Sequence, residues 1–308
     1  MVLGEVRAGE EEVRIAAAVQ QSQQGRWTRW DEVVARRLSW SDVWKIDQAR
    51  IGFLISSVYD VLPSPSNLAR WHLADHPVCQ LCQSRGTLRH ILSACPSALG
   101  QGRYTWRHNK VLEVLVGCVI EAIRKARPTS AKSYTTRFVR AGQPPNDVKK
   151  TQTNKSSMLD GSNSWKINAD LKGMECRFPV TVATSNRRPD IVVWSEDTRN
   201  VFLIELTVPW EEAMDEAHER KLERYALLQE ECVSNGWRCQ VRPVEVGCRG
   251  FVGTSTRTLL SAFGFGGREL NTHIRHLSDA AEAASRWLWL KRQDQWTGGR
   301  DTATSTAQ

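Results

Sequence analysis

Apolar residues recur at helical intervals through most of the first 127 residues. Residues 9–60 show this spacing in two parts: Val13, Ala16 and Ala17 begin one segment, and residues 30–58 contain a second, which Pro63 and Pro65 end. A further helix is expected at 104–127, with apolar side chains on one side at Val111, Leu112, Leu115, Val119 and Ile123. We therefore predict a mostly helical region at 1–75 and, at 76–127, a Cys/His segment followed by a helix.

The pattern becomes polar and aperiodic after Pro128, and residues 128–164 are predicted to form a flexible linker. Two apolar runs, 191–194 and 201–208, then enclose the turn-like residues 195–200, which is typical of a β-hairpin whose strands are buried on both faces. A helix is expected at 210–234, a strand at 237–246 in which Pro243 indicates an edge or a bend, and a helix at 277–292. This order predicts an α/β domain at 165–295, followed by a disordered tail at 296–308.

Composition narrows the function classes only in part. The 42 Lys plus Arg exceed the 34 Asp plus Glu among 308 residues, and the resulting charge of +8 favours an anionic partner such as nucleic acid. No run of apolar residues is long enough to span a membrane, and acidic residues precede the first alanine-rich run, which is the wrong order for a signal peptide. We therefore expect an intracellular protein with no membrane partner, in which close cysteine spacing indicates metal binding rather than disulfides.

Four potential zinc ligands lie within 17 residues, namely Cys79, Cys82, His90 and Cys95. Structural zinc binds four such sulfur and nitrogen atoms in a tetrahedron, and a Cys-x-x-Cys turn presents two sulfurs to one ion. Gly86 lies between the ligand pairs, where the chain has to reverse. The alternative is a histidine that packs between helices beside incidental cysteines. Because a closed site leaves no position for water, we predict a structural zinc in a small nucleic-acid-binding knuckle.

Two carboxylates are predicted to meet across the hairpin. If the hairpin turn is centred on the Asp197–Thr198 bond, opposed residue numbers sum to 395, and Asp190 plus Glu205 have that sum. The two residues would then be cross-strand neighbours with Cβ atoms roughly 4.5–5.5 Å apart. Such a pair would repel and raise one pKa, unless a hard divalent cation such as magnesium bridged the oxygens.

Lys221 lies in the middle of the apolar stripe of the helix expected at 210–234. Lysine is rarely placed on a core-facing stripe without an anion to meet, and the two acids of the sheet are the candidates. Two carboxylates, a metal and a lysine are the parts that phosphodiester hydrolysis needs. The alternative is a buried Glu205–Lys221 ion pair that only holds the helix to the sheet.

Together these residues resemble the PD-(D/E)xK nuclease superfamily, and more specifically the restriction-like endonuclease region at the C-terminus of site-specific non-LTR retrotransposon proteins. In that family an Arg-Pro-Asp motif precedes a second acidic residue, as Arg188-Pro189-Asp190 here precedes Glu205 with 14 residues between. The superfamily lysine usually lies two residues after the second acid, where this chain has Thr207. In the retrotransposon branch it lies on the following helix, like Lys221, and Tyr225 resembles the family's Lys-x-x-x-Tyr feature. A Cys-Cys-His-Cys knuckle also precedes the nuclease in those proteins.

The resemblance implies a metal-dependent DNA endonuclease that nicks target DNA, with structural zinc and catalytic magnesium or manganese. Asp190, Glu205 and Lys221 would be catalytic, with Asp190 and Glu205 as metal ligands. A third acid would be Asp170 or, alternatively, Glu175, and Tyr225 is a further catalytic candidate. DNA and element RNA are the implied partners in the nucleus. No Asp-Asp pair occurs, so the polymerase site of those proteins is absent. The chain therefore resembles a C-terminal fragment, a truncated copy or a domesticated remnant, and a reverse transcriptase acting in trans is one implied partner.

Candidate DNA contacts are the basic residues beside the two predicted sites. They are Arg187 and Arg188 next to the carboxylates, and Arg85, Arg89, Arg103, Arg107 and Lys110 around the knuckle. Two alternatives remain open: a catalytically inactive zinc-knuckle remnant that binds nucleic acid, and a zinc-stabilised protein-interaction scaffold. Only the scaffold would lack salt-dependent binding to DNA.

Overall fold

The computed structural model describes residues 2–21, 30–36, 39–127, 157–174 and 177–296. The N-terminal part contains α1 (Val2–Val19), α2 (Trp40–Val43), α3 (Gln48–Val58), α4 (Pro65–Arg70), η2 (His90–Ala94), α5 (Pro96–Gly100) and α6 (Arg103–Lys125). The remaining elements are β1 (Lys166–Ala169), β2 (Ile191–Ser195), β3 (Asn200–Thr207), η3 (Glu211–Ala213), α7 (Met214–Ser234), β4 (Arg238–Glu245), α8 (Thr254–Ala262) and α9 (Gly267–Leu290). The predicted α/β class is therefore confirmed.

The four strands form one mixed sheet in the order β1-β2-β3-β4. β1, β2 and β3 pair antiparallel, whereas β3 and β4 are parallel and are connected through α7. The β2–β3 register pairs Ile191 with Ile204 and Trp194 with Val201, so opposed residues sum to 395 as predicted. β4 is an edge strand, which explains how it accommodates Pro243.

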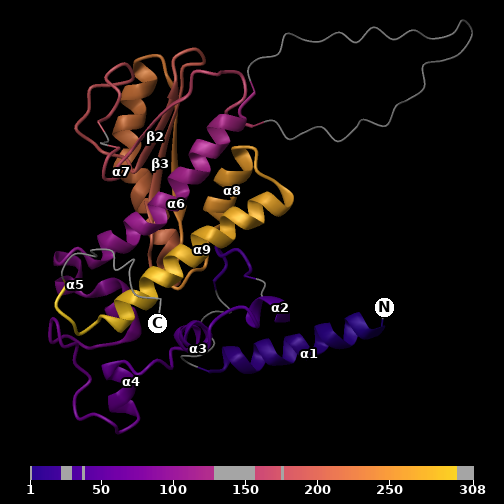
Figure 1. The fold of residues 1–308 in the computed structure, drawn as a ribbon, viewed down its shortest axis with the longest axis vertical. Coiled ribbons are helices and arrows are strands. Elements are labelled where there is room, and N and C mark those ends of the chain that lie inside the picture. The colour runs from indigo at the N-terminus through magenta and orange to yellow at the C-terminus, as the bar shows by residue number, and fades with distance from the viewer. Residues whose placement is uncertain (1, 22–29, 37–38, 128–156, 175–176, 297–308) are drawn as a thin grey trace, which may run out of the picture.

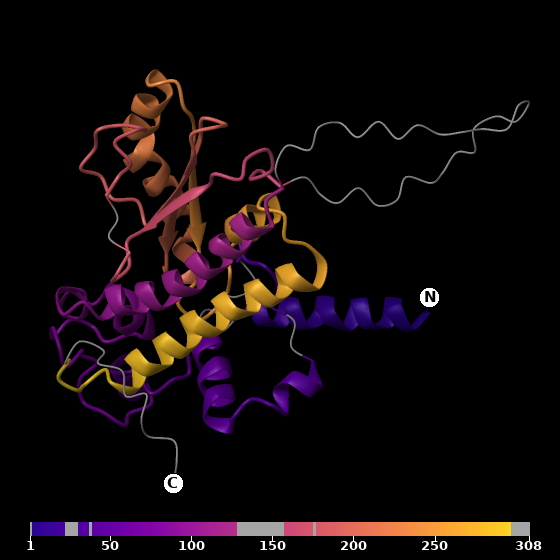
Figure 2. The ribbon, with the colours of Figure 1, turned by 45° about the horizontal axis from the view of Figure 1, so that its top comes forward.

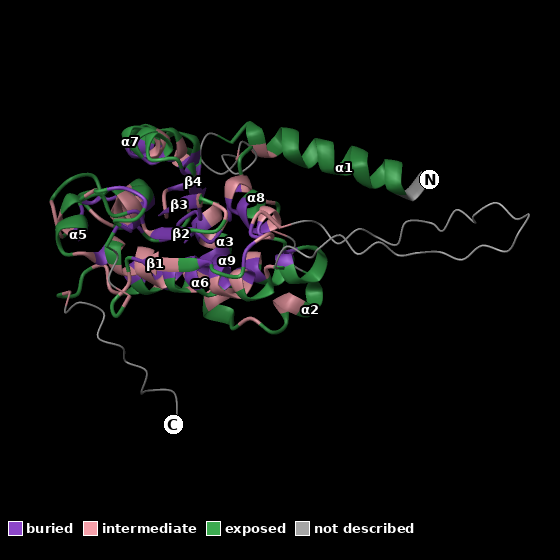
Figure 3. Cartoon of the chain, turned by 90° about the horizontal axis from the view of Figure 1, so that it is seen from above, coloured by how far each residue is buried: buried purple, intermediate pink, exposed green. Residues whose placement is uncertain are grey.

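Helices cover both faces of the sheet, which explains why its strands are apolar on both sides. Seen from above, α7 lies on one side of the strands and α6 and α9 lie on the other (Figure 3). Alternate residues of β2 divide accordingly, because Ile191 and Val193 pack with α6, α8 and α9, whereas Val192 and Trp194 pack with α7. By the same alternation, Asp190 and Glu205 belong to the face of the sheet that α7 covers.

The long helices α6 and α9 run side by side beneath the sheet (Figures 1 and 2). Helix α6 was expected at 104–127, and its residues Val111, Leu112, Leu115 and Val119 are completely buried, as the periodicity predicts. Leu159, from the C-terminal end of the predicted linker, is completely buried in the same core as α6 and the sheet. Residues 128–156 of that linker and 297–308 of the predicted tail lie outside the described residues.

Several predictions of secondary structure were wrong or incomplete, and β1 was not predicted. Residues 30–36 are not helical, because Val33 and Val34 pair instead with Gly253 and Val252 in the turn after β4. The C-terminal helix begins at Gly267 rather than 277, and α8 was not predicted. Trp296 was predicted to belong to the disordered tail, but its ring packs edge-on against that of Trp106, with the ring centroids 5.7 Å apart. None of the helices in the described ranges is long and apolar enough to cross a lipid bilayer.

Candidate functional sites

The four predicted zinc ligands come together in one cluster. The ligand atoms of Cys79, Cys82, His90 and Cys95 all lie within 4.8 Å of one another. Cys79 Sγ is 3.9 Å from Cys95 Sγ, and Cys82 Sγ is 3.1 Å from His90 Nε2. All three cysteines are free thiols. This Cys3His cluster has the donor atoms and spacing that zinc requires, and it could bind the ion.

Local backbone geometry explains how the cluster forms. Val78 and Arg85 form an antiparallel bridge, so the chain reverses between Cys82 and Gly86. Gln83, not Gly86, takes the left-handed conformation in this reversal, with φ 62°. Gly86 is needed for a different reason, because a Cβ at this position would lie 2.8 Å from the ring of Pro65.

The ionisation of the cluster suits metal binding. Burial lowers the pKa of His90, which keeps the imidazole neutral, as a metal ligand must be. Burial acts to raise the pKa of the Cys82 thiol, but hydrogen bonds with Ser84, Cys95 and Cys79 outweigh it and lower the pKa. Burial raises the pKa of Cys95 to about 11, so this thiol needs a cation to lose its proton.

The predicted carboxylate pair lies where β2 begins. Glu205 Oε2 accepts a hydrogen bond from the backbone N–H of Asp190 at 3.0 Å, and Asp190 Oδ2 accepts one from the N–H of Leu206 at 2.8 Å. The Glu205 side chain is 4% exposed and that of Asp190 13%. Burial, followed by the charge of Asp190, raises the pKa of Glu205. Two oxygen donors that repel each other in a partly buried site fit a hard divalent cation.

Helix α7 supplies the predicted lysine. Lys221 Nζ donates to Glu205 Oε1 at 2.6 Å, and the lysine side chain is 16% exposed. Tyr225, one turn later, is buried, and its hydroxyl donates to the carbonyl of Arg188 at 3.2 Å. Tyr225 therefore holds the Arg-Pro-Asp segment against α7. The structure thus brings Asp190, Glu205, Lys221 and Tyr225 into one site.

His108 is a member of this site that sequence reasoning missed. Its Nε2 lies 3.3 Å from Asp190 Oδ2 and 3.2 Å from the carbonyl of Leu206. Burial acts to lower the pKa of His108, but the hydrogen bond and charge of Asp190 outweigh it, so the pKa lies above its ordinary value. A signal was present, because His108 precedes Val111 and Leu112 by three and four positions on the buried stripe of α6.

The structure brings the backbone of Asp170, but not its side chain, to the Asp190–Glu205 pair. The N–H of Asp170 donates to the carbonyl of Asp190 at 2.9 Å, and the Asp170 side chain is exposed. Two groups of at least three Cys, His, Asp or Glu residues in the described part of the chain bring all their ligand atoms within 4.8 Å, and neither includes Asp170. Its place as a third acid stays a prediction, and the alternative, Glu175, lies outside the described residues.

The predicted DNA-contacting arginines divide into exposed and buried sets. Arg85, Arg89, Arg187 and Arg188 are exposed. Arg103 and Arg107 are buried, which argues against contact with DNA. Arg107 donates to the carbonyls of Leu92 at 2.7 Å and Val208 at 3.1 Å, and Arg103 donates to the carbonyls of Lys291 and Asp294. These two arginines tie segments of the fold together.

A comparison with models of known protein families finds no match for this chain. A comparison with curated protein sequences finds no relative either.

Proposed function

We propose that the chain is a metal-dependent endonuclease that hydrolyses phosphodiester bonds in DNA. The observation that supports this most directly is the Lys221–Glu205 contact of 2.6 Å beside Asp190, on two strands and a helix that the fold brings together. Paired carboxylates with an adjacent ammonium are suited to binding a divalent cation and an anionic phosphate. The resemblance to restriction-like endonucleases of non-LTR retrotransposons points in the same direction.

Asp190 and Glu205 would hold a magnesium or manganese ion, because carboxylate oxygens suit both metals. When bound, that ion supplies Lewis acidity toward the scissile phosphate and toward a water molecule. Lys221 stabilises negative charge that develops on the phosphate oxygens, and its position is maintained by Glu205. The ammonium remains available to substrate because the lysine is only partly buried.

His108 and Tyr225 hold the ligands in place. His108 contacts Asp190 Oδ2 and so leaves the second carboxylate oxygen, Oδ1, to face other partners. Burial acts to lower the pKa of His108, but the hydrogen bond and charge of Asp190 raise it, which favours the protonated ring that donates to this carboxylate. Tyr225 acts on the backbone of Arg188, two residues before Asp190. His108 and Tyr225 are therefore positioning residues, and the proposed reaction includes no proton transfer by either of them.

The Cys3His cluster with a zinc ion would act as a nucleic-acid-binding knuckle. The exposed Arg85 and Arg89 lie in the segment between its ligands, and Arg187 and Arg188 lie beside the carboxylates. These four cations can neutralise DNA phosphates at two places on the molecule. Action on DNA in the nucleus, with element RNA and a reverse transcriptase in trans, completes the proposal.

The proposal is tested by incubating the full chain with supercoiled plasmid and magnesium or manganese. Asp190→Asn and Lys221→Met are expected to abolish nicking. The matched control is Lys166→Met, because Lys166 forms an exposed ion pair with Glu196 at 2.8 Å on the same sheet. Its nicking rate should equal that of the unaltered chain.

Three outcomes would overturn the proposal that this site is a nuclease. Absence of nicking with DNA binding that weakens steeply in salt would favour an inactive nucleic-acid-binding protein. Absence of both would favour the protein-interaction scaffold. Nicking that survives Asp190→Asn and Lys221→Met would show that this site does not carry the activity.

A further inference from the structure

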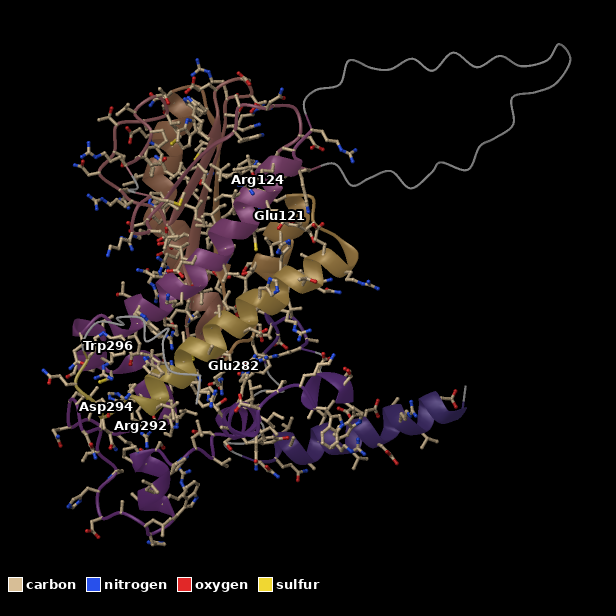
Figure 4. All side chains as sticks on the ribbon, in the orientation of Figure 1. Glu121, Arg124, Glu282, Arg292, Asp294 and Trp296 are labelled. Atoms are coloured by element: carbon tan, nitrogen blue, oxygen red, sulfur yellow. The ribbon has the colours of Figure 1, made fainter. Side chains whose placement is uncertain are left out.

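A second group of potential metal ligands lies where α6 and α9 meet, outside the sites described above. It consists of Glu121 on α6 and Glu269 and His273 on α9, whose ligand atoms all lie within 4.8 Å of one another. Figure 4 labels Glu121 on the part of α6 that runs beside α8 and α9. Glu269 and His273 are four residues apart, so they lie on the same face of α9.

His273 is the member of this group that distinguishes it from a surface ion-pair network. The residue is 8% exposed, and its ring packs against Phe265 with the ring centroids 4.3 Å apart. Among the described residues its Nε2 is a buried nitrogen with no hydrogen-bond partner. This atom lies 3.5 Å from Glu121 Oε2. A buried nitrogen without a hydrogen-bond partner lowers the stability of the fold. This nitrogen also faces a carboxylate oxygen, so its surroundings need an explanation.

The contact of His273 with Cys118 explains this geometry if a cation is bound between His273 and Glu121. The Sγ of Cys118 lies 3.3 Å from His273 Nδ1, in the buried interior between the helices. With the proton on Nδ1, the ring donates to the sulfur and directs the lone pair of Nε2 toward Glu121. Metal-bound histidines commonly have this arrangement, in which the second ring nitrogen donates to a neighbouring group that fixes the ring. Two acceptors 3.5 Å apart are then stabilised by a cation between them.

Lys125 is the internal competitor for the carboxylates. Its Nζ lies 2.7 Å from Glu121 Oε1 and also contacts Glu269 Oε1. The ammonium does not satisfy Nε2 of His273, because that nitrogen has no hydrogen-bond partner among the described residues. The Lys125 side chain is 49% exposed and can move into solvent when a divalent ion takes its place.

We propose that Glu121, Glu269 and His273 form a binding site for a divalent transition-metal ion that joins α6 to α9. Two carboxylates and one imidazole suit zinc, cobalt or manganese, whereas magnesium and calcium prefer oxygen ligands throughout. Water completes the coordination, since both glutamates are about 40% exposed. The site is independent of the nuclease proposal, because none of its ligands touches Asp190, Glu205 or Lys221.

The test begins with the full chain loaded with one equivalent of zinc, which fills the Cys3His cluster only. This chain is titrated with Co²⁺ and followed by visible absorption and by NMR of paramagnetically shifted imidazole N–H protons. The unaltered chain should bind a Co²⁺ ion that shifts one such proton. Glu269→Gln and His273→Gln should each weaken this binding by about tenfold or more. Lys125→Met should tighten it, since the competing ammonium is gone. The matched control is Glu113→Gln, an exposed α6 glutamate that pairs with Lys110 at 3.5 Å, and it should change nothing.

Glu269→Gln and Lys125→Met alter side chains that are 43% and 49% exposed, so both variants should fold even if the buried His273→Gln does not. Equal Co²⁺ affinity in the unaltered chain, Glu269→Gln and Lys125→Met would overturn the proposal. So would Co²⁺ binding without a shifted imidazole proton. Plasmid nicking by Glu269→Gln is measured in parallel, and its retention would separate failure of this site from failure of the nuclease.

Discussion

Replacing Lys221 by methionine tests its contact with Glu205. The expected loss of unfolding free energy follows from how far the two side chains are buried. The change keeps the apolar stem of the side chain but leaves the Glu205 carboxylate, 4% exposed, without its ammonium partner. Removing one member of a buried ion pair costs about 3–5 kcal/mol. Because Lys221 is 16% exposed, we expect the lower end, about 3 kcal/mol of unfolding free energy, or roughly a hundredfold in the folding equilibrium.

The loss should depend on pH with a defined sign. Burial, followed by the charge of Asp190, already raises the pKa of Glu205 above 4.5, and loss of Lys221 raises it further. A carboxyl with a raised folded pKa stabilises the fold below its unfolded pKa and loses that contribution as pH rises through the folded pKa. Lys221→Met should therefore cost least near pH 4.5 and progressively more above it. Added magnesium should recover part of the loss at neutral pH.

The assay is urea unfolding of both chains across this pH range, followed by tryptophan fluorescence. Lys166→Met is again the control, because its exposed pair with Glu196 should be worth less than about 1 kcal/mol. Glu205→Gln and the double variant complete a cycle, in which the double variant should be more stable than Lys221→Met alone. Equal losses for Lys221→Met and Lys166→Met at every pH would refute the reasoning that Glu205 is a buried charge.

Four further predictions concern the zinc ligands, His108 and two of the candidate DNA-contacting arginines. Cys82→Ser should remove one chelator-resistant zinc per chain, measured by elemental analysis, and full retention would exclude Cys82 as a ligand. The gap in unfolding free energy between the unaltered chain and His108→Gln should shrink as pH rises above 6.5, because the raised pKa of His108 stabilises the fold only below its folded value; a pH-independent gap would contradict this. Arg107→Met should cost about 3 kcal/mol by leaving two buried carbonyls unpaired, yet leave the salt dependence of DNA binding unchanged. Arg89→Ala should do the reverse, reducing the slope of log affinity against log salt by about one; equal slopes would place Arg89 off the DNA.

The sequence predicted the hairpin in detail because strand pairing has a strict period. Once the turn was centred between Asp197 and Thr198, one arithmetic rule placed Asp190 opposite Glu205. The observed β2–β3 pairs have the same sum, and the Asp190 N–H donates to the Glu205 carboxylate. Lys221 was equally predictable, since a lysine on an apolar helical stripe must find an anion nearby. The Cys3His cluster needed only ligand type and spacing. All three depend on local periodicity.

Contacts between distant segments were not predictable in this way. His108 reaches Asp190 across 82 residues, and only the packing of α6 on the sheet decides that they meet. The segment 30–36 has apolar spacing compatible with a helix, but Val34 pairs with Val252 instead. Arg107 was interpreted as a DNA contact because of its charge, although it precedes Val111 by four positions on the buried stripe of α6. Long-range pairing overrides local preference at each of these positions.

The first turns of α6 connect the two predicted sites physically. The Tyr104 hydroxyl accepts the N–H of Cys95 at 3.0 Å and donates to the carbonyl of Ile91 at 2.9 Å, so it holds the segment that carries two of the candidate zinc ligands. One turn later, Arg107 bonds the carbonyls of Leu92 and Val208. His108, the next residue, contacts Asp190. These side chains extend from consecutive turns of one rigid helix. A change in the structure of the Cys3His cluster should therefore shift the carboxylate pair as well. The cluster therefore supports the candidate catalytic site as well as its own loop.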